Sequence, residues 1–144
     1  MMLVKQISVF VENARGKLSK VTQILAENGI NIRALSIADT TDFGILRLIV
    51  QDPEKAVAAL KENDITVKST DVIVVEIDDK PAGLHKALTL LRDAEIAVEY
   101  MYAFVSKKEN EAYVILKCDK AQEAVSALTD GGVHVIAAKD VYEL

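Results

Sequence analysis

The sequence has few of the residues on which many kinds of site depend. It holds one cysteine, two histidines and no tryptophan in 144 residues. Because Cys118 stands alone, an intrachain disulfide and a metal site with several thiolate ligands are both excluded. His85 and His134 fall at non-equivalent places in the repeat described below, so we do not expect them to act as a pair. The sequence therefore predicts no metal site and no cofactor.

Long apolar runs and an excess of positive charge are also missing. The longest apolar runs, such as Val72–Val75, are about four residues, whereas a membrane-spanning helix needs about 20. The N-terminal stretch has no apolar core of signal-peptide length, so we expect a cytoplasmic protein with no membrane partner. There are 17 basic and 22 acidic residues, which give a net charge of −5. Binding to nucleic acid through phosphates is not expected at this charge.

The sequence does have a globular composition and an internal repeat. Hydrophobic residues make up 51% and charged residues 27% of the chain, as in folded domains. A shift of 66 residues aligns the front of the two halves and a shift of 68 aligns their ends, with the extra residues entering within 106–111. Matching residues include Ile7 and Ile73, Lys20 and Lys86, Leu48 and Leu116, and Leu60 and Leu128. We predict a duplicated small domain, with copies at 1–70 and 71–144.

Each half has the pattern strand, helix, strand, strand, helix, strand. Alternating apolar residues predict strands over 5–11, 30–38, 44–51 and 65–68, and again over 73–77, 96–105, 112–117 and 133–137. Helical spacing predicts helices around 18–25, 56–60, 84–91 and 124–128. Short polar turns, at 40–42 and 107–110, indicate hairpins. The fold class is α+β: two tandem ferredoxin-like βαββαβ units, each an antiparallel sheet with both helices on one face.

Local signals predict where the helices begin and end. Asp52 precedes Pro53 and is expected to cap the second helix. Asp119, followed by Gln122 three residues later, has the pattern of a capping box. A glycine at position 29 is a good stop for the first helix, and the second copy has the weaker Ala94-Glu95 there.

The sheet faces away from the helices are too apolar to lie open to water. In the first copy this face carries Phe10, Ile45 and Ile49, and in the second it carries Tyr113 and Ile115. Apolar surfaces of this kind usually mark an interaction site. We expect another unit of this size, within the chain or in a second chain, to cover or extend each sheet, and we expect a homodimer.

The turns from the first strand into the first helix of each copy are the most informative segments for a ligand. They run from Val11 to Leu18 and from Ile77 to Leu84, each with a glycine just before the helix. Free backbone N–H groups at a helix start attract carboxylates, and glycine allows a ligand to approach closely. A tight turn with no ligand explains the glycine equally well. The pair Asp78-Asp79 is either a solvated turn or part of a ligand loop.

These turns resemble those of the ACT domain, an amino-acid-sensing regulatory module. The resemblance rests on Asn13-Ala-Arg-Gly16-Lys-Leu18, on Gly29-Ile30-Asn31-Ile32, and on Asp79-Lys-Pro81-Ala-Gly-Leu84 in the second copy, and it covers the whole chain as a tandem pair. It implies that a small amino acid or related metabolite is bound at an interface between ACT units. The residues carried over are Asn13, Arg15, Gly16, Lys17, Leu18 and Asn31, with Asp79, Pro81, Ala82, Gly83 and Leu84 in the second copy.

Three departures from the ACT pattern indicate that the two sites are unequal. Arg15 stands where the family usually has proline. Ala82 stands where the second copy should have its glycine, and Gly83 comes one residue late. Ala97 replaces the polar side chain of Asn31. The first copy is therefore expected to hold the better site.

The pattern is consistent with four functions to different degrees. The favoured one is a non-catalytic amino-acid-binding regulatory or sensor protein, and a variant is the regulatory subunit of a separate biosynthetic enzyme, such as an acetolactate-synthase-like complex. An RNA-recognition motif shares the element order, but it needs a basic sheet with exposed aromatic residues. An acylphosphatase-like hydrolase needs an arginine and an asparagine beside an anion-binding loop, which Asn13 and Arg15 could imitate.

Overall fold

The computed structural model describes residues 1–39, 42–105 and 108–144, which form two compact units. The N-terminal unit comprises residues 5–70 and 142–144, and the C-terminal unit comprises residues 1–4 and 71–141. The turn predicted at 40–42 and the insertion predicted within 106–111 fall partly outside the described residues. No helix within the described part of the chain is long and apolar enough to cross a membrane.

The N-terminal unit has the predicted element order. Its elements are β1 (Val4–Glu12), α1 (Lys17–Glu27), β2 (Ile32–Asp39), β3 (Phe43–Val50), α2 (Pro53–Glu62) and the start of β4 (Val67–Asp78). The strands follow the order β2-β3-β1-β4, and β3 is antiparallel to both neighbours. Just before β4, the carbonyl oxygen of Thr66 accepts a 3.0 Å hydrogen bond from the amide of Phe10.

The C-terminal unit repeats this arrangement. It contains the rest of β4, α3 (Gly83–Asp93), β5 (Val98–Val105), β6 (Glu111–Cys118), α4 (Ala121–Asp130), β7 (His134–Val135) and α5 (Ala138–Tyr142), whose last residue belongs to the other unit. Strand β4 pairs antiparallel with β6 on one side and with β7 on the other. Ile7 lies opposite Leu48 and Ile73 lies opposite Leu116, so the registers match at shifts of 66 and 68. The α+β fold with two βαββαβ units is confirmed.

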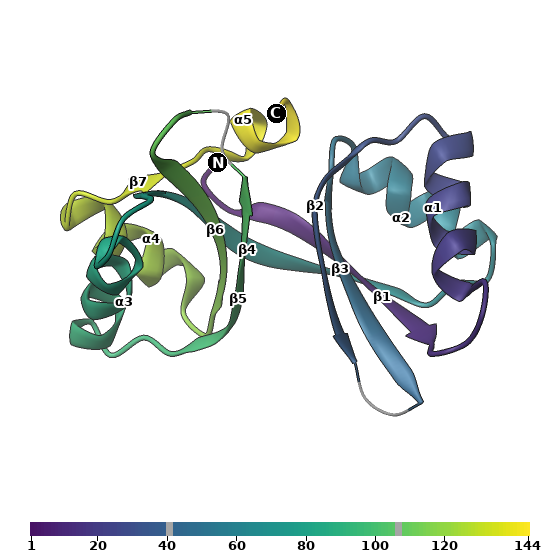
Figure 1. Ribbon diagram of the computed structural model, residues 1–144, viewed down its shortest axis with the longest axis horizontal. Helices are drawn as coiled ribbons and strands as arrows, with labels where there is room; N and C mark the ends of the chain where they lie inside the picture. The colour runs from purple at the N-terminus through teal and green to yellow at the C-terminus, as the bar shows by residue number, and fades with distance from the viewer. Residues whose placement is uncertain (40–41, 106–107) are drawn as a thin grey trace. The chain divides into compact units, whose positions relative to one another are not determined.

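The two helices of each unit pack on one face of its sheet, α1 with α2 and α3 with α4 (Figure 1). Apolar side chains between helices and sheet form one core per unit. The first core is Ile7, Val9, Val21, Ile24, Leu25, Ile30, Leu46, Leu48, Val50, Ala56, Ala59 and Leu60. The second is Ile73, Val75, Ala87, Leu91, Ile96, Val114, Leu116, Cys118, Ala124, Leu128, Val133 and Val135.

Helix ends follow the predictions in three places out of four. Asp52 caps α2, because its Oδ1 accepts a 3.2 Å hydrogen bond from the amide of Lys55. Gly29 and Glu95 both adopt positive φ, at 67° and 58°, just after α1 and α3. The predicted capping box at Asp119 is wrong. Its Oδ1 instead accepts from the amide of Ala97 at 3.1 Å, and the residue that precedes α4 is Lys120, which makes no side-chain cap.

Two features near the ends of the predicted copies differ from the expectations. The strands predicted at 65–68 and 73–77 are parts of one strand, because the polar residues between them include no glycine or proline to break it. A short helix, α5, follows β7 and was not predicted, since its five residues are too few to show a helical period. Beyond it, the Tyr142 hydroxyl accepts a 2.7 Å hydrogen bond from the amide of Lys5, and its carbonyl accepts one from Arg33 at 3.0 Å.

Candidate functional site: two equivalent pockets

Each unit has a pocket beside the start of its first helix. The pocket of the C-terminal unit, called here the Lys86 pocket, has a volume of about 510 Å³. That of the N-terminal unit, the Lys20 pocket, has about 430 Å³. Both volumes lie in the range of small-molecule sites. The Lys86 pocket is lined by Glu76, Ile77, Asp78, Lys80, Pro81, Ala82, Gly83, Lys86, Lys108, Glu111, Gly132, Val133 and His134. The Lys20 pocket is lined by Phe10, Val11, Glu12, Lys17, Lys20, Val21, Phe43, Asn63, Asp64, Ile65 and Thr66.

The two pockets occupy the same place in the repeat. Each is formed by the end of the first strand, the start of the first helix, the start of the third strand and the turn after the second helix. The shift of 66 residues places Lys20 on Lys86, and the shift of 68 places Ile65 on Val133. The pocket is therefore a feature that both copies of the repeat share.

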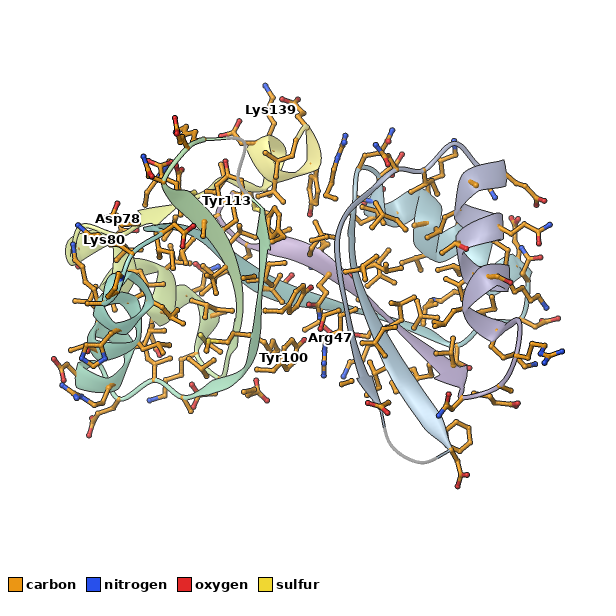
Figure 2. All side chains as sticks on the ribbon, viewed as in Figure 1. Arg47, Asp78, Lys80, Tyr100, Tyr113 and Lys139 are labelled. Atoms are coloured by element: carbon orange, nitrogen blue, oxygen red, sulfur yellow. The ribbon has the colours of Figure 1, made fainter. Side chains whose placement is uncertain are left out.

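Ion pairs occupy one side of the Lys86 pocket. The Glu76 side chain is only 7% exposed, and its carboxylate contacts the Lys108 ammonium at 3.3 Å and Nδ1 of His134 at 3.1 Å. At the rim, the carboxylate of Asp78 lies 3.5 Å from the ammonium of Lys80, and Figure 2 shows the two side chains together. A buried carboxylate is stabilised by partners of this kind. These acids are thus largely satisfied by the protein itself.

Unlike these acids, the lysine that names each pocket is not paired within the part of the chain that the structure describes. The structure gives the ammonium groups of Lys20 and Lys86 no ion pair or side-chain hydrogen bond with the described residues. The Nζ of Lys86 lies 3.8 Å from the position that a Cβ on Gly132 would take, so it reaches over the turn after α4. Each lysine can offer its charge to a carboxylate in its pocket.

The loop before the first helix has the same backbone in both units. The residue preceding the helix is left-handed in each, with φ of 80° at Gly16 and 72° at Ala82. The amide of Asn13 donates to the carbonyl of Asp42 at 2.8 Å, and that of Asp79 donates to the carbonyl of Asn110 at 2.8 Å. The turn therefore keeps the same backbone although the second copy has Ala82 where the first has Gly16, and has its glycine one residue later.

Four of the site residues carried over from the resemblance line these pockets: Lys17, Pro81, Ala82 and Gly83. Asn13, Arg15, Gly16 and Asp79 belong to the loops before these helices, and Leu18 and Leu84 lie in the first turns of α1 and α3. The four of them in the N-terminal unit are exposed. Asn31 lies at the other end of α1, whose 11 residues span about 16 Å. Within one unit, the structure does not bring Asn31 to the Gly16 loop.

Sequence reasoning missed several pocket residues: Lys20, Lys86, Phe10, Phe43, Glu76 and His134. A signal for the lysines was present, since Lys20 falls on Lys86 in a repeat whose matches are otherwise mostly apolar. No partner for His134 was predicted, and its contact with Glu76 spans 58 residues of sequence. Spacing alone could not have found that contact.

No group of three or more metal-ligating side chains is found among residues 1–39, 42–105 and 108–144. The other histidine, His85, has its Nε2 3.4 Å from the Oγ1 of Thr89, one turn along α3.

Comparison with known proteins identifies the family. The sequence profile described as "ACT domain pair" matches residues 2–144, and among curated proteins none matches the chain. Protein BT0572 from Bacteroides thetaiotaomicron is 41% identical, with a TM-score of 0.94 over 99% of this chain and 98% of that one. The regulatory subunit of aspartate kinase from Thermus thermophilus is 19% identical, with a TM-score of 0.64 over 90% and 94%. That from Thermus flavus is 20% identical, with a TM-score of 0.61 over 88% and 91%. This chain belongs to the ACT domain pair family.

Proposed function

We propose that this chain is a non-catalytic regulatory protein that binds a small amino acid in the pockets beside α1 and α3. The observation that carries the proposal is the lysine repeated in both pockets, Lys20 and Lys86, whose ammonium groups make no ion pair with the residues that the structure describes. A carboxylate is the group common to all amino acids, and an ammonium group that lines a pocket can form a charge-assisted hydrogen bond with it. Membership of the ACT domain pair family supports a regulatory role for this binding.

A thermal-shift screen of the intact chain against the twenty amino acids tests the proposal. An amino acid present at 100 times its Kd stabilises the native state by about 2.7 kcal/mol and raises the Tm by several degrees. The shift should decrease in Lys20→Met, in Lys86→Met or in both. Lys55→Met, an exposed lysine on α2 outside both pockets, is the matched control. No shift with any of the twenty would overturn the proposal.

The chain is also proposed to have no catalytic activity. The hydrolase alternative needs Asn13 and Arg15 to act together beside an anion, and both are exposed in the loop before α1. A screen with acyl phosphate and other small ester substrates should show no turnover. Turnover that disappears in Asn13→Ala or Arg15→Ala would instead support the hydrolase.

We further propose that the protein is a homodimer. Strand β2 lies at the end of the N-terminal sheet, and its Leu35 and Ile37 are 54% and 47% exposed. An apolar strand at a sheet edge is a template for pairing with another chain. Sedimentation equilibrium should give twice the monomer mass of 15.7 kDa, and Ile37→Lys should lower the apparent mass. Thr22→Lys, exposed on α1, is the control. A monomer at micromolar concentration would contradict this.

A further inference from the structure

Each unit includes a short segment that lies beyond the other unit in the sequence. Residues 1–4 belong to the C-terminal unit, although residues 5–70 separate them from the rest of it. Residues 142–144 belong to the N-terminal unit, although residues 71–141 separate them from the rest of that unit. We call these two pieces the exchanged segments. Each unit therefore has to close a long loop of chain, and that loop is the other unit.

The first exchanged segment is packed into the C-terminal unit. Val4 is fully buried, and Met2 and Leu3 pack against the core of that unit. The carbonyl oxygen of Met1 accepts a 2.9 Å hydrogen bond from the amide of Ala138, the first residue of α5. Apolar burial and a backbone hydrogen bond both stabilise the docked segment. The C-terminal unit thus loses part of its core whenever this segment detaches.

The second exchanged segment is anchored to the N-terminal unit by Tyr142. Its hydroxyl accepts a 2.7 Å hydrogen bond from the amide of Lys5 in β1, and its carbonyl oxygen accepts one of 3.0 Å from Nε of Arg33 in β2. Tyr142 thus holds two strands that are not neighbours, since β3 lies between them in the sheet. The preceding residue, Val141, is fully buried and belongs to the C-terminal unit. A contact made in one unit therefore follows directly on a side chain fixed in the other.

The chain crosses between the units inside regular structure. The crossings fall within β1, β4 and α5, and glycine and proline are absent from residues 1–12, 67–78 and 138–142. Linkers that let domains behave independently are flexible and rich in glycine, serine or other polar residues. Here the unfolding of one unit has to disturb an element that the other unit also uses.

We propose that the exchanged segments join the two units into one cooperative folding unit, so that neither opens alone. While the C-terminal unit is folded, it fixes Val141, and Tyr142 binds β1 and β2 with little further loss of chain entropy. Once that unit unfolds, the same contact has to close a loop of residues 71–141, which costs chain entropy. The first exchanged segment gives the reverse coupling, because unfolding of the N-terminal unit turns residues 5–70 into such a loop.

This coupling is a property of the chain and does not depend on the amino-acid-binding function proposed above. If that function holds, a ligand bound by either unit would stabilise both units, which is a route by which one site influences the other.

Native-state hydrogen exchange of the full chain, with matched cavities in the two cores, tests the proposal. Leu60 and Leu128 are equivalent in the repeat, and both are 0% exposed. Leu128→Ala should speed exchange of the Leu116 amide, in the C-terminal core, by about 30-fold or more. The Leu48 amide, in the N-terminal core, should respond by the same factor, and Leu60→Ala should act equally on both amides.

The milder variants Leu60→Val and Leu128→Val give the same comparison where an alanine variant does not fold. If each cavity speeds exchange only in its own unit, the units open independently and the proposal is overturned.

A second experiment tests whether the exchanged segments carry the coupling. Tyr142→Phe combined with Arg33→Met removes both hydrogen bonds of the second segment and keeps the ring. In this background, Leu128→Ala should speed exchange in the N-terminal core less than in the C-terminal core. Asp52→Ala, which removes a helix cap within the N-terminal unit, is the matched control background and should leave the two factors equal. Equal factors in the double variant would overturn the role assigned to the exchanged segments.

Discussion

Ala82 has the left-handed backbone conformation that Gly16 has at the equivalent position of the other unit. Their φ angles are 72° and 80°, and each precedes the first helix of its unit. An L-residue pays for this conformation because its Cβ approaches the following carbonyl, whereas glycine does not. The fold therefore imposes the turn on Ala82, although its local sequence no longer favours it.

Replacing Ala82 by glycine should stabilise the protein. The left-handed strain at this position is about 1–2 kcal/mol, and its relief exceeds the entropy that glycine adds to the unfolded chain. We expect the urea midpoint of Ala82→Gly to rise, with an increase in the free energy of unfolding of about 0.5–1 kcal/mol. Ala26→Gly, exposed in the helical part of α1, should lower it by about 1 kcal/mol. A loss of stability in both variants would contradict the argument.

Asp52 and Lys120 are equivalent cap positions with unequal caps. Their backbones agree, with φ −136° and ψ 87° at Asp52 and φ −126° and ψ 74° at Lys120, but only Asp52 accepts a hydrogen bond from the helix. Asp52→Ala should cost about 1 kcal/mol of unfolding free energy, and Lys120→Asp should add about 0.5–1 kcal/mol. Urea denaturation measures both. Lys120→Ala removes the same ammonium without adding a cap, so a gain of equal size in that variant would contradict the explanation.

The two cap positions show which parts of the fold the sequence could predict. The core pattern predicted the strands, helices and tandem repeat, because apolar periodicity follows burial directly. The predicted cap at Asp119 was wrong because the capping-box pattern does not say which of two adjacent residues begins the helix. At the shift of 68, Asp119 falls on Gln51, whereas the cap residue Asp52 falls on Lys120. Gln51 and Asp119 make the same contact, each accepting from the amide at the start of the second strand.

The candidate site was less predictable than the fold. The helix-start loops were found because glycine and proline mark turns locally. The pockets also need the third strand and the turn after the second helix, which lie far away in sequence. Phe43 and Glu111 could be assigned to a pocket only once the register placed them opposite Glu12 and Asp78. Long-range pairing of this kind leaves no pattern in one sequence.

Cys118 should be inert in the folded protein. It is buried within the second core, and burial raises the pKa of its thiol to about 11 from 9.0. At pH 8, roughly one thiol in a thousand is then ionised in the folded chain, against roughly one in ten when the chain is unfolded, and the thiolate is the reactive form. Labelling with Ellman's reagent at pH 8 should therefore be more than about 100-fold slower without urea than in denaturing urea. Similar rates in both conditions would show that the thiol is accessible.

The same shift fixes the sign of a pH effect on stability. Between pH 9.0 and about 11 the folded chain keeps the Cys118 proton that the unfolded chain loses. The free energy of unfolding should therefore decrease as pH rises through this window. Cys118→Ala removes this contribution, so the difference in stability between it and the wild type should narrow from pH 8 to pH 10. A difference that stays constant would mean that the thiol titrates equally in both states.

Gly83 should tolerate substitution less well than Gly16, for a steric reason. A Cβ on Gly83 would lie 2.1 Å from the carbonyl oxygen of Asp78, so the backbone at the end of β4 would have to move. A Cβ on Gly16 would meet no atom within 4 Å and would add only the strain of its positive φ. We expect Gly83→Ala to cost about 2–3 kcal/mol of unfolding free energy and Gly16→Ala about 1 kcal/mol.

Urea denaturation of both variants measures this difference, and near-ultraviolet circular dichroism reports whether packing is kept. The result also decides how the Lys86 pocket should be probed. Because Gly83 supports the turn itself, loss of ligand binding in a Gly83 variant would reflect a displaced β4 as much as a blocked site. Ala82 is exposed in the same loop, and asparagine tolerates its left-handed backbone, so Ala82→Asn tests the loop's approach to a ligand without the clash at Asp78. Equal losses of unfolding free energy in Gly83→Ala and Gly16→Ala would mean that the backbone between β4 and α3 can move at little cost. In that case a Gly83 substitution could be used to test ligand binding directly.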